Sequence, residues 1–200
     1  IGGEAKFNIN GVDITLMQET QYPWEGTIKL KVKGADGNRF SLCLRRPGWS
    51  RQVDLYINGE ESSVGSRIKD GYIHVDRTWY DGDIVELRLH MTPELMQASP
   101  ESRHNAGKAV IQMGPLVFCL EEIDNCKNLS LISIPADIKL QAVYDNSLLG
   151  GAMMVKCQGY RTNEDSWGEE LYRPIQVDEK PFVIKAIPYF MWGNREKGEM

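Results

Sequence analysis

The sequence predicts an all-β fold made of two consecutive antiparallel β-sandwich domains. Three observations support this prediction. Apolar and polar residues alternate along short runs, turn residues separate these runs at spacings of about ten residues, and no convincing amphipathic helix pattern occurs. Alternation with a period of two places one face of a strand in a core and the other in water, as antiparallel sandwiches require. The composition is that of a globular chain, with 42% hydrophobic and 26% charged residues.

The first half of the chain contains the clearest strands. The run TIKLKVK, residues 27–33, places its apolar residues on one face and three lysines on the other. The same alternation recurs in RFSLCL, VDLYI, GYIHVDRTW and DIVELRLHM, residues 39–44, 53–57, 71–79 and 83–91. The dipeptides Asp36-Gly37 and Asn58-Gly59 favour the positive φ angles of tight turns, so we expect a hairpin at each.

The alternation stops over residues 92–108, where Pro, Ser, Glu and Asn accumulate. We therefore expect one β-sandwich domain over residues 1–92, a linker over 93–106 and a second β-sandwich domain over 107–200. The runs of the second half, such as AVIQMGPLVFCLEE and PFVIKAIPYFMW, are more continuously apolar, which indicates strands buried on both faces. The polar stretch 160–180 is expected to be an exposed loop.

Charge and hydropathy exclude two classes of partner. The formal net charge is -5 and the basic residues are scattered, whereas nucleic-acid binding needs clustered Lys and Arg. The longest apolar run, PLVFCL, has six residues, against about 20 for a membrane helix. We expect a soluble protein, with cytoplasm and periplasm left open. Because the chain begins at Ile1 without a methionine, we also expect it to be a piece of a longer one.

The cysteines do not predict a metal site. Four are present, Cys43, Cys119, Cys126 and Cys157, without any C-x-x-C pair or nearby His. Because Cys43, Cys119 and Cys157 lie in apolar runs, we expect free thiols that pack as small hydrophobes. A disulfide between Cys119 and Cys126 is the alternative.

Histidines and acids give no catalytic prediction either. His74 alternates with apolar neighbours and is expected on the outer face of a strand, although strand pairing could bring it near His90. Glycosidases use two carboxylates across a sugar. Three pairs of neighbouring acids could be considered: Asp81 with Asp83, Glu121 with Glu122, and Glu169 with Glu170. Such acids usually serve turn chemistry and solvation, so we assign no catalytic residue.

Three tryptophans are candidate sugar-stacking residues: Trp24, Trp49 and Trp192. Trp24 and Trp49 each lie beside a proline, where a rigid backbone can hold a flat ring against a sugar. Packing of these large rings against a core is the interpretation that we prefer. In that interpretation Pro47 and Gly48 turn the chain after a strand and Trp49 covers the edge of a core.

Six stretches match one pattern in their order and spacing: TQYPWEGTIKLKV, FSLCLRRPGW, INGE, GYIHVDRTWYDGDIVELRLHM, GKAVIQMGPLVFCLEEID and IPYFMWGNREKGEM. Over nearly the whole chain this pattern resembles the C-terminal region of the β-L-arabinofuranosidase-like glycoside hydrolases, family 127 and its relatives. The sequence departs from the family pattern at Arg46, Met113 and Gly193, where an apolar residue, a basic residue and an alanine are usual.

The resemblance implies an enzyme in which a helical (α/α) barrel precedes β-sandwich domains and carries the chemistry. A zinc-bound cysteine acts as nucleophile in that barrel, and its motif includes a Cys-Cys pair and a Glu-x-Cys element. Neither occurs in this chain, so no catalytic or metal position is carried over and zinc is expected only in the catalytic domain. The expected role is that of a non-catalytic accessory region whose partner is the catalytic barrel of the same parent chain. The alternative is a carbohydrate-binding module that uses exposed Trp or Tyr side chains.

Overall fold

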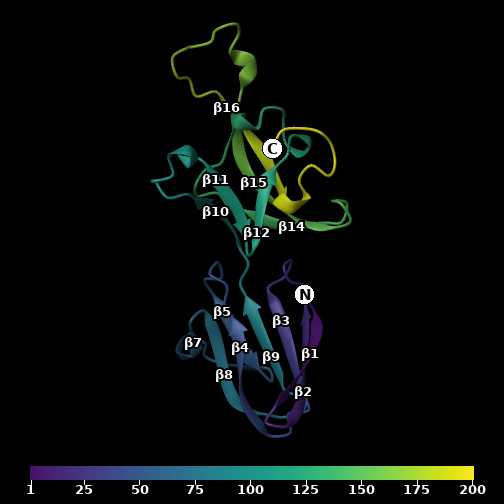
Figure 1. Cartoon of the computed structure of the whole chain (residues 1–200). Coiled ribbons are helices and arrows are strands. Elements are labelled where there is room, and N and C mark those ends of the chain that lie inside the picture. The colour runs from purple at the N-terminus through teal and green to yellow at the C-terminus, as the bar shows by residue number, and fades with distance from the viewer. The chain divides into compact units, whose positions relative to one another are not determined.

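The computed structural model describes all residues from 1 to 200, and these form two compact units, Ile1–Met91 and Thr92–Met200 (Figure 1). The regular elements are β-strands and short 3-10 helices, and every strand pairing is antiparallel. The predicted class, all-β with antiparallel β-sandwich domains, is confirmed. No helix has the length and apolar character needed to span a membrane.

The first unit contains a six-stranded sheet in the order β1-β2-β3-β9-β5-β6 and a three-stranded sheet in the order β4-β8-β7. Its elements are β1 (Gly3–Ile9), β2 (Val12–Thr20), β3 (Thr27–Lys33), β4 (Asn38–Arg45), β5 (Val53–Ile57), β6 (Glu60–Glu61), η1 (Gly65–Arg67), β7 (Ile68–Lys69), β8 (Tyr72–Trp79) and β9 (Ile84–Leu89).

The core of the first unit is built from the apolar face of each alternating run. Leu30 and Val32 of β3 are buried in one cluster with Ile73 and Val75 of β8, which belongs to the other sheet. The ring of Trp79 is fully buried there, and its Nε1 donates a hydrogen bond of 2.9 Å to the carbonyl oxygen of Phe40. Burial of the indole N–H is tolerated because this bond satisfies it.

The two predicted hairpins differ in outcome. Asn58 and Gly59 have φ angles of 53° and 84° and join β5 to β6, which pair with each other. Asp36 and Gly37 also adopt positive φ, at 41° and 84°, but β3 and β4 lie in different sheets, so this turn is not a hairpin. The dipeptide determines the local backbone, whereas the partner of each strand is decided by which apolar faces pack together.

The second unit contains a seven-stranded sheet in the order β10-β11-β12-β16-β15-β13, with β14 also paired to β15. Its strands are β10 (Pro93–Gln97), β11 (Ala109–Met113), β12 (Leu116–Leu120), β13 (Ile132–Ser133), β14 (Gln141–Asp145), β15 (Ala152–Thr162) and β16 (Glu179–Pro188). Its 3-10 helices are η2 (Arg103–Asn105), η3 (Glu122–Asp124), η4 (Leu129–Leu131), η5 (Glu164–Ser166) and η6 (Tyr189–Met191).

The segment 93–106, which we expected to be a linker, contains an element of the second sheet. Residues 93–97 form β10, which pairs with β11 in a register that sets Leu95 opposite Ile111. Pro93 is compatible with this pairing because β10 is an edge strand, and edge strands tolerate proline. The two large apolar residues of β10, Leu95 and Met96, are adjacent, so the segment has no alternation that would stand out in the sequence.

Burial on both faces, expected for the second half, holds only in part. In β16 the consecutive residues Ala186 and Ile187 are both fully buried. By contrast, Val110 of β11, Val117 of β12 and Val183 of β16 are 46, 44 and 48% exposed. The continuous apolar runs therefore do not mean that every strand is covered on both sides.

Candidate functional site

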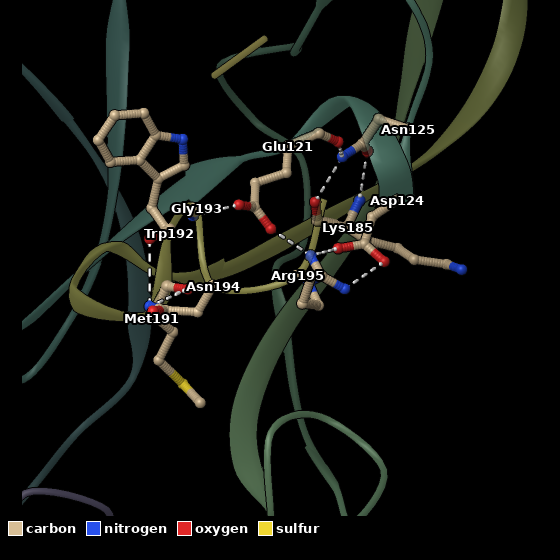
Figure 2. A network of polar contacts seen from close by, with 9 residues as sticks. All are labelled: Glu121, Asp124, Asn125, Lys185, Met191, Trp192, Gly193, Asn194 and Arg195. Atoms are coloured by element: carbon tan, nitrogen blue, oxygen red, sulfur yellow. Dashed lines mark hydrogen bonds and ion pairs between the residues drawn. The ribbon is translucent and has the colours of Figure 1, made fainter. Parts of the chain in front are cut away.

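The most elaborate polar site of the second unit forms where the end of the chain returns to the sheet (Figure 2). Strand β16 ends at Pro188, η6 turns the chain, and Gly193 continues it with a φ of 71°. This left-handed conformation suits a glycine, and it leads the chain to Arg195. Figure 2 shows Arg195 pointing toward two acids, Glu121, which directly precedes η3, and Asp124, the last residue of η3.

Arg195 is bound by two carboxylates. Its Nη1 donates to Oδ1 of Asp124 at 3.1 Å, and its Nη2 contacts a carboxylate oxygen of both Asp124 and Glu121. Glu121 is only 5% exposed, and its other oxygen accepts a hydrogen bond of 2.8 Å from the backbone N–H of Gly193. The hydrogen bonds that Arg195 donates to Asp124 and Glu121 raise the pKa of Arg195 above its usual value despite burial, so the guanidinium stays charged.

Two asparagines complete the network with backbone groups. Nδ2 of Asn125 donates to the carbonyl oxygens of Glu121 and Lys185, both at 2.9 Å, and its Oδ1 accepts from the N–H of Lys185 at 2.9 Å. Nδ2 of Asn194 donates to the carbonyl oxygen of the buried Met191 at 3.0 Å. The network thereby ties the η3 turn, β16 and the chain end to one another.

A pocket of about 270 Å³ adjoins this network, and eight residues line it: Asp124, Asp145, Ser147, Leu148, Met154, Lys156, Lys185 and Arg195. The register sets Lys156 directly opposite Lys185 on neighbouring strands. Asp145 is hydrogen-bonded within its own turn: its Oδ1 accepts from the N–H of Ser147 at 2.9 Å and from the hydroxyl of Ser147 at 2.6 Å. These bonds lower the pKa of Asp145.

The chemistry open to this site is limited. Glu121 and Asp124 are neighbouring acids, but both are bound to Arg195, so neither is free to act as a general acid or base toward a sugar. The structure contains no group of three or more His, Cys, Asp or Glu side chains that could hold a metal ion. The network serves to hold the chain end in place.

The cysteines are all free thiols, so Cys119 and Cys126 are not bonded to each other. Burial raises the pKa of Cys119 to about 11, and burial also raises the pKa of Cys126 and Cys157. These thiols are protonated at neutral pH and are therefore poor nucleophiles and metal ligands.

Cys43 was expected to be buried, but the structure shows it exposed. It lies on the outer face of β4, opposite His74 of β8, with 3.4 Å between Sγ and Nδ1. His74 thus occupies the outer strand face predicted for it. It is not brought to His90, whose Nε2 instead lies 2.7 Å from the carboxylate of Asp54. The hydrogen bond from His90 lowers the pKa of Asp54.

The acids at the Tyr80 to Asp83 turn have structural contacts. Oδ1 of Asp83 accepts from Asn58 at 2.7 Å, and Oδ2 accepts from the N–H of Tyr80 at 3.0 Å. Burial opposes ionisation, but these bonds and the charge of Arg77 lower the pKa of Asp83 overall. Asp81 accepts from the N–H of Gly34 at 2.8 Å. Both carboxylates stabilise turns rather than facing a common site.

The three candidate tryptophans differ in placement. Trp24 and Trp49 belong to the first unit and are half-buried, and Trp49 packs against its core. Trp192 belongs to the second unit, is 45% exposed and stacks on Tyr189, with 6.3 Å between ring centroids. Of the three, Trp192 has the exposure that sugar stacking requires.

Reasoning from the residues missed the role of Arg195 and its two acids. Their positions are separated by 71 and 74 residues, so no local pattern links them. The sequence offered one signal for this site: the polar tail GNREKGEM, which contains Arg195, directly follows an apolar run.

Comparisons with known proteins agree with the resemblance in the sequence. The family model of the GH127 β-L-arabinofuranosidase middle domain matches residues 1–91, and that of the glycoside hydrolase family 127 C-terminal domain matches residues 93–200. The chain is 32% identical to a non-reducing end β-L-arabinofuranosidase of Bifidobacterium longum subsp. longum, over 94% of this chain and 30% of that protein.

Solved structures show the same relationship. A GH127 β-L-arabinofuranosidase from Geobacillus stearothermophilus T6 is similar with a TM-score of 0.96 and 41% identity, over 99% of this chain and 31% of that one. A GH127 β-arabinofuranosidase is similar with a TM-score of 0.86 and 27% identity, over 98% of this chain and 32% of that one. The chain thus spans 30 to 32% of the length of these relatives. With both family models matched, the chain belongs to glycoside hydrolase family 127, of which it contains the middle and the C-terminal domain.

Proposed function

We propose that this chain is the non-catalytic accessory region of a β-L-arabinofuranosidase-like glycoside hydrolase, and that it supports a helical-barrel catalytic domain of the same polypeptide. The observation that carries the proposal is coverage: the chain matches 31% of an enzyme named as a GH127 β-L-arabinofuranosidase, over 99% of its own length. The zinc and the catalytic cysteine belong to the catalytic domain in this proposal.

The side chains of the chain support a structural role. Its most buried acids, Glu121 and Asp83, are bound to Arg195 and to turn residues respectively. An autonomous glycosidase would instead need two carboxylates facing a common cleft. Ion pairs and hydrogen bonds that hold turns and the chain end are what a rigid brace requires.

The test compares this 200-residue chain with the full-length polypeptide encoded by the same gene, using p-nitrophenyl β-L-arabinofuranoside as substrate. We expect the full-length polypeptide to release p-nitrophenol and the chain alone to release none above the blank. Turnover by the chain alone, or an inactive full-length polypeptide with an intact fold, contradicts the proposal.

Carbohydrate binding is the second candidate function, and the exposed stack of Trp192 and Tyr189 favours it. The two rings are 45 and 50% exposed, so each leaves part of its apolar ring accessible to a sugar. Calorimetric titration with arabino-oligosaccharides tests this function. If the stack binds sugar, Trp192→Ala abolishes the heat, whereas Trp167→Ala, at a tryptophan 37% exposed, does not. No heat with the unsubstituted chain removes this function.

A further inference from the structure

The outer face of the three-stranded sheet in the first unit holds a thiol beside an imidazole. Sγ of Cys43 lies 3.4 Å from Nδ1 of His74, its partner across the ladder between β4 and β8. Oγ of Ser41, the next residue on the same face of β4, lies 3.9 Å from the same sulfur. Cys43 is exposed, whereas the other three cysteines are buried or partly buried. Cys43 is therefore the thiol that a reagent in solution reaches most easily.

The imidazole gives this thiol a base. An unprotonated ring nitrogen within hydrogen-bonding distance of a thiol can accept its proton as the sulfur attacks. The thiolate is the attacking species in thiol–disulfide exchange, so a neighbouring base favours the reaction. The pairing of Cys43 with His74 in the antiparallel register keeps the two side chains together on one face.

The row of residues beside this pair is positively charged. Tyr72 lies opposite Arg45 of β4 and opposite Lys69 of β7, so all three side chains share the outer face with Cys43. The guanidinium carbon of Arg45 lies 6.0 Å from the centroid of the Tyr72 ring, a contact that holds the cation beside the thiol.

The acids near this row leave its charge in place. The paired rows of β4, β8 and β7 contain three cations on the outer face, Arg39, Arg45 and Lys69, and one acid, Asp76. Arg39 already binds Asp76, with hydrogen bonds of 3.3 and 3.1 Å. Asp70 lies in the turn that joins β7 to β8, beyond the paired rows. The face therefore attracts anions, although the chain as a whole has a net charge of -5.

We propose that Cys43 is a site of reversible S-thiolation, at which a small disulfide that carries carboxylates forms a mixed disulfide with the protein. In this site Arg45 and Lys69 bind the carboxylates, and His74 accepts the proton of the thiol. A metal ion fits the site less well. Zinc sites use three or four protein ligands, whereas the structure contains no group of three or more His, Cys, Asp or Glu side chains that could hold a metal.

The exchange is balanced in atoms and electrons. Sγ of Cys43 forms a bond to one sulfur of the small disulfide while its proton moves to Nδ1 of His74. The disulfide bond of the reagent breaks, and the departing thiolate takes the proton from the imidazole. The thiol of Cys43 is thus oxidised to a mixed disulfide, and one half of the reagent is reduced to a free thiol.

Peptide mapping by mass spectrometry tests the proposal, with glutathione disulfide as the reagent. The 200-residue chain and the full-length polypeptide are each incubated with it at neutral pH, and the adduct on every cysteine is followed with time. We expect Cys43 to gain one glutathione in both proteins, about tenfold or more faster than Cys119, and dithiothreitol to remove it. Either protein without an adduct on Cys43, or with Cys119 modified as fast, overturns the proposal.

A histidine variant tests the role of the base. His74→Ala should slow the modification of Cys43 about tenfold or more. Free imidazole should restore part of the rate in this variant and leave the unsubstituted chain unchanged, which a purely structural role of His74 does not predict. His90→Ala is the matched control, since His90 is bound to Asp54. An unchanged rate in His74→Ala, no rescue by imidazole, or an equal loss in His90→Ala overturns the proposal.

A charge variant tests the binding of the carboxylates. Arg45→Gln with Lys69→Gln should lower the rate with glutathione disulfide about fivefold and should not lower the rate with cystamine, a disulfide that carries positive charges. Lys31→Gln with Lys33→Gln is the control, because these two lysines are exposed on β3 of the other sheet. Equal rates of the two double variants with glutathione disulfide, or an equal loss with both reagents, overturn the proposal.

Discussion

Replacing Arg195 by methionine is expected to destabilise the second unit by about 3 kcal/mol. The substitution keeps the aliphatic part of the side chain and removes the positive charge between two acids whose side chains are 6 and 14% exposed. Removing one member of a buried ion pair costs about 3 to 5 kcal/mol, because the remaining charge is left unpaired. The lower figure applies here, since Arg195 itself is 18% exposed.

The assay is urea denaturation of the 200-residue chain, followed by far-ultraviolet circular dichroism and by hydrogen exchange of the amides of β16. In thermal unfolding of the same chain, a loss of about 3 kcal/mol lowers the melting temperature of a unit of this size by about 12 °C.

Two further variants make this prediction discriminating. Glu121→Gln with Asp124→Asn, added to Arg195→Met, removes the unpaired charges and should recover part of the loss. Arg39→Met breaks the exposed pair between Arg39 and Asp76, at 71 and 55% exposure, and should leave the midpoint unchanged. A loss below about 1 kcal/mol for Arg195→Met, or an equal loss for Arg39→Met, would refute the reasoning that burial makes the Arg195 network strong.

Three other predictions concern the core, the thiols and the response to acid. Trp79→Ala should destabilise the first unit by about 3 to 5 kcal/mol in urea denaturation, because the ring is fully buried; a smaller change would mean that the core refills the cavity. Cys43 should react with Ellman's reagent at pH 8 well before Cys119, whose pKa is raised to about 11, and the opposite order would contradict the assigned burial. Asp83→Asn should destabilise the chain at pH 7 and have little effect once the pH is below the lowered pKa of Asp83, because a carboxylate with a depressed folded pKa stabilises only above it; a loss that is independent of pH would assign the effect to packing.

Local patterns in the sequence were enough to identify five of the nine strands of the first unit, β3, β4, β5, β8 and β9, whereas β1, β2, β6 and β7 were not predicted. The alternation of residues 27–33 has the same two faces in the structure as in the sequence, with Leu30 and Val32 buried and the lysines outside. The Asn58-Gly59 turn and the outward position of His74 were also predicted correctly. Each of these features depends on neighbours within a few positions, so the sequence around it contains the whole signal.

Cys43 shows the limit of this reasoning. It lies in an apolar run and was expected to be buried, yet it lies on the outer face of β4, opposite His74. The alternation of the run with Leu42 and Leu44 on the inner face already places Cys43 outside, so the expectation from its residue type was the wrong guide. Strand β10 was missed for a related reason, since a short edge strand needs only one partner and little apolar surface.

The sequence by itself determined that the chain forms strands, where most of them turn, and which enzyme family its motifs resemble, because side-chain period and turn chemistry are local. Only the tertiary structure decided that β3 and β4 join different sheets, and that Arg195 meets Glu121 and Asp124. The physical reason is that strand partners and long-range ion pairs follow from the packing of whole apolar faces. The free energy of that packing depends on residues far apart in the chain.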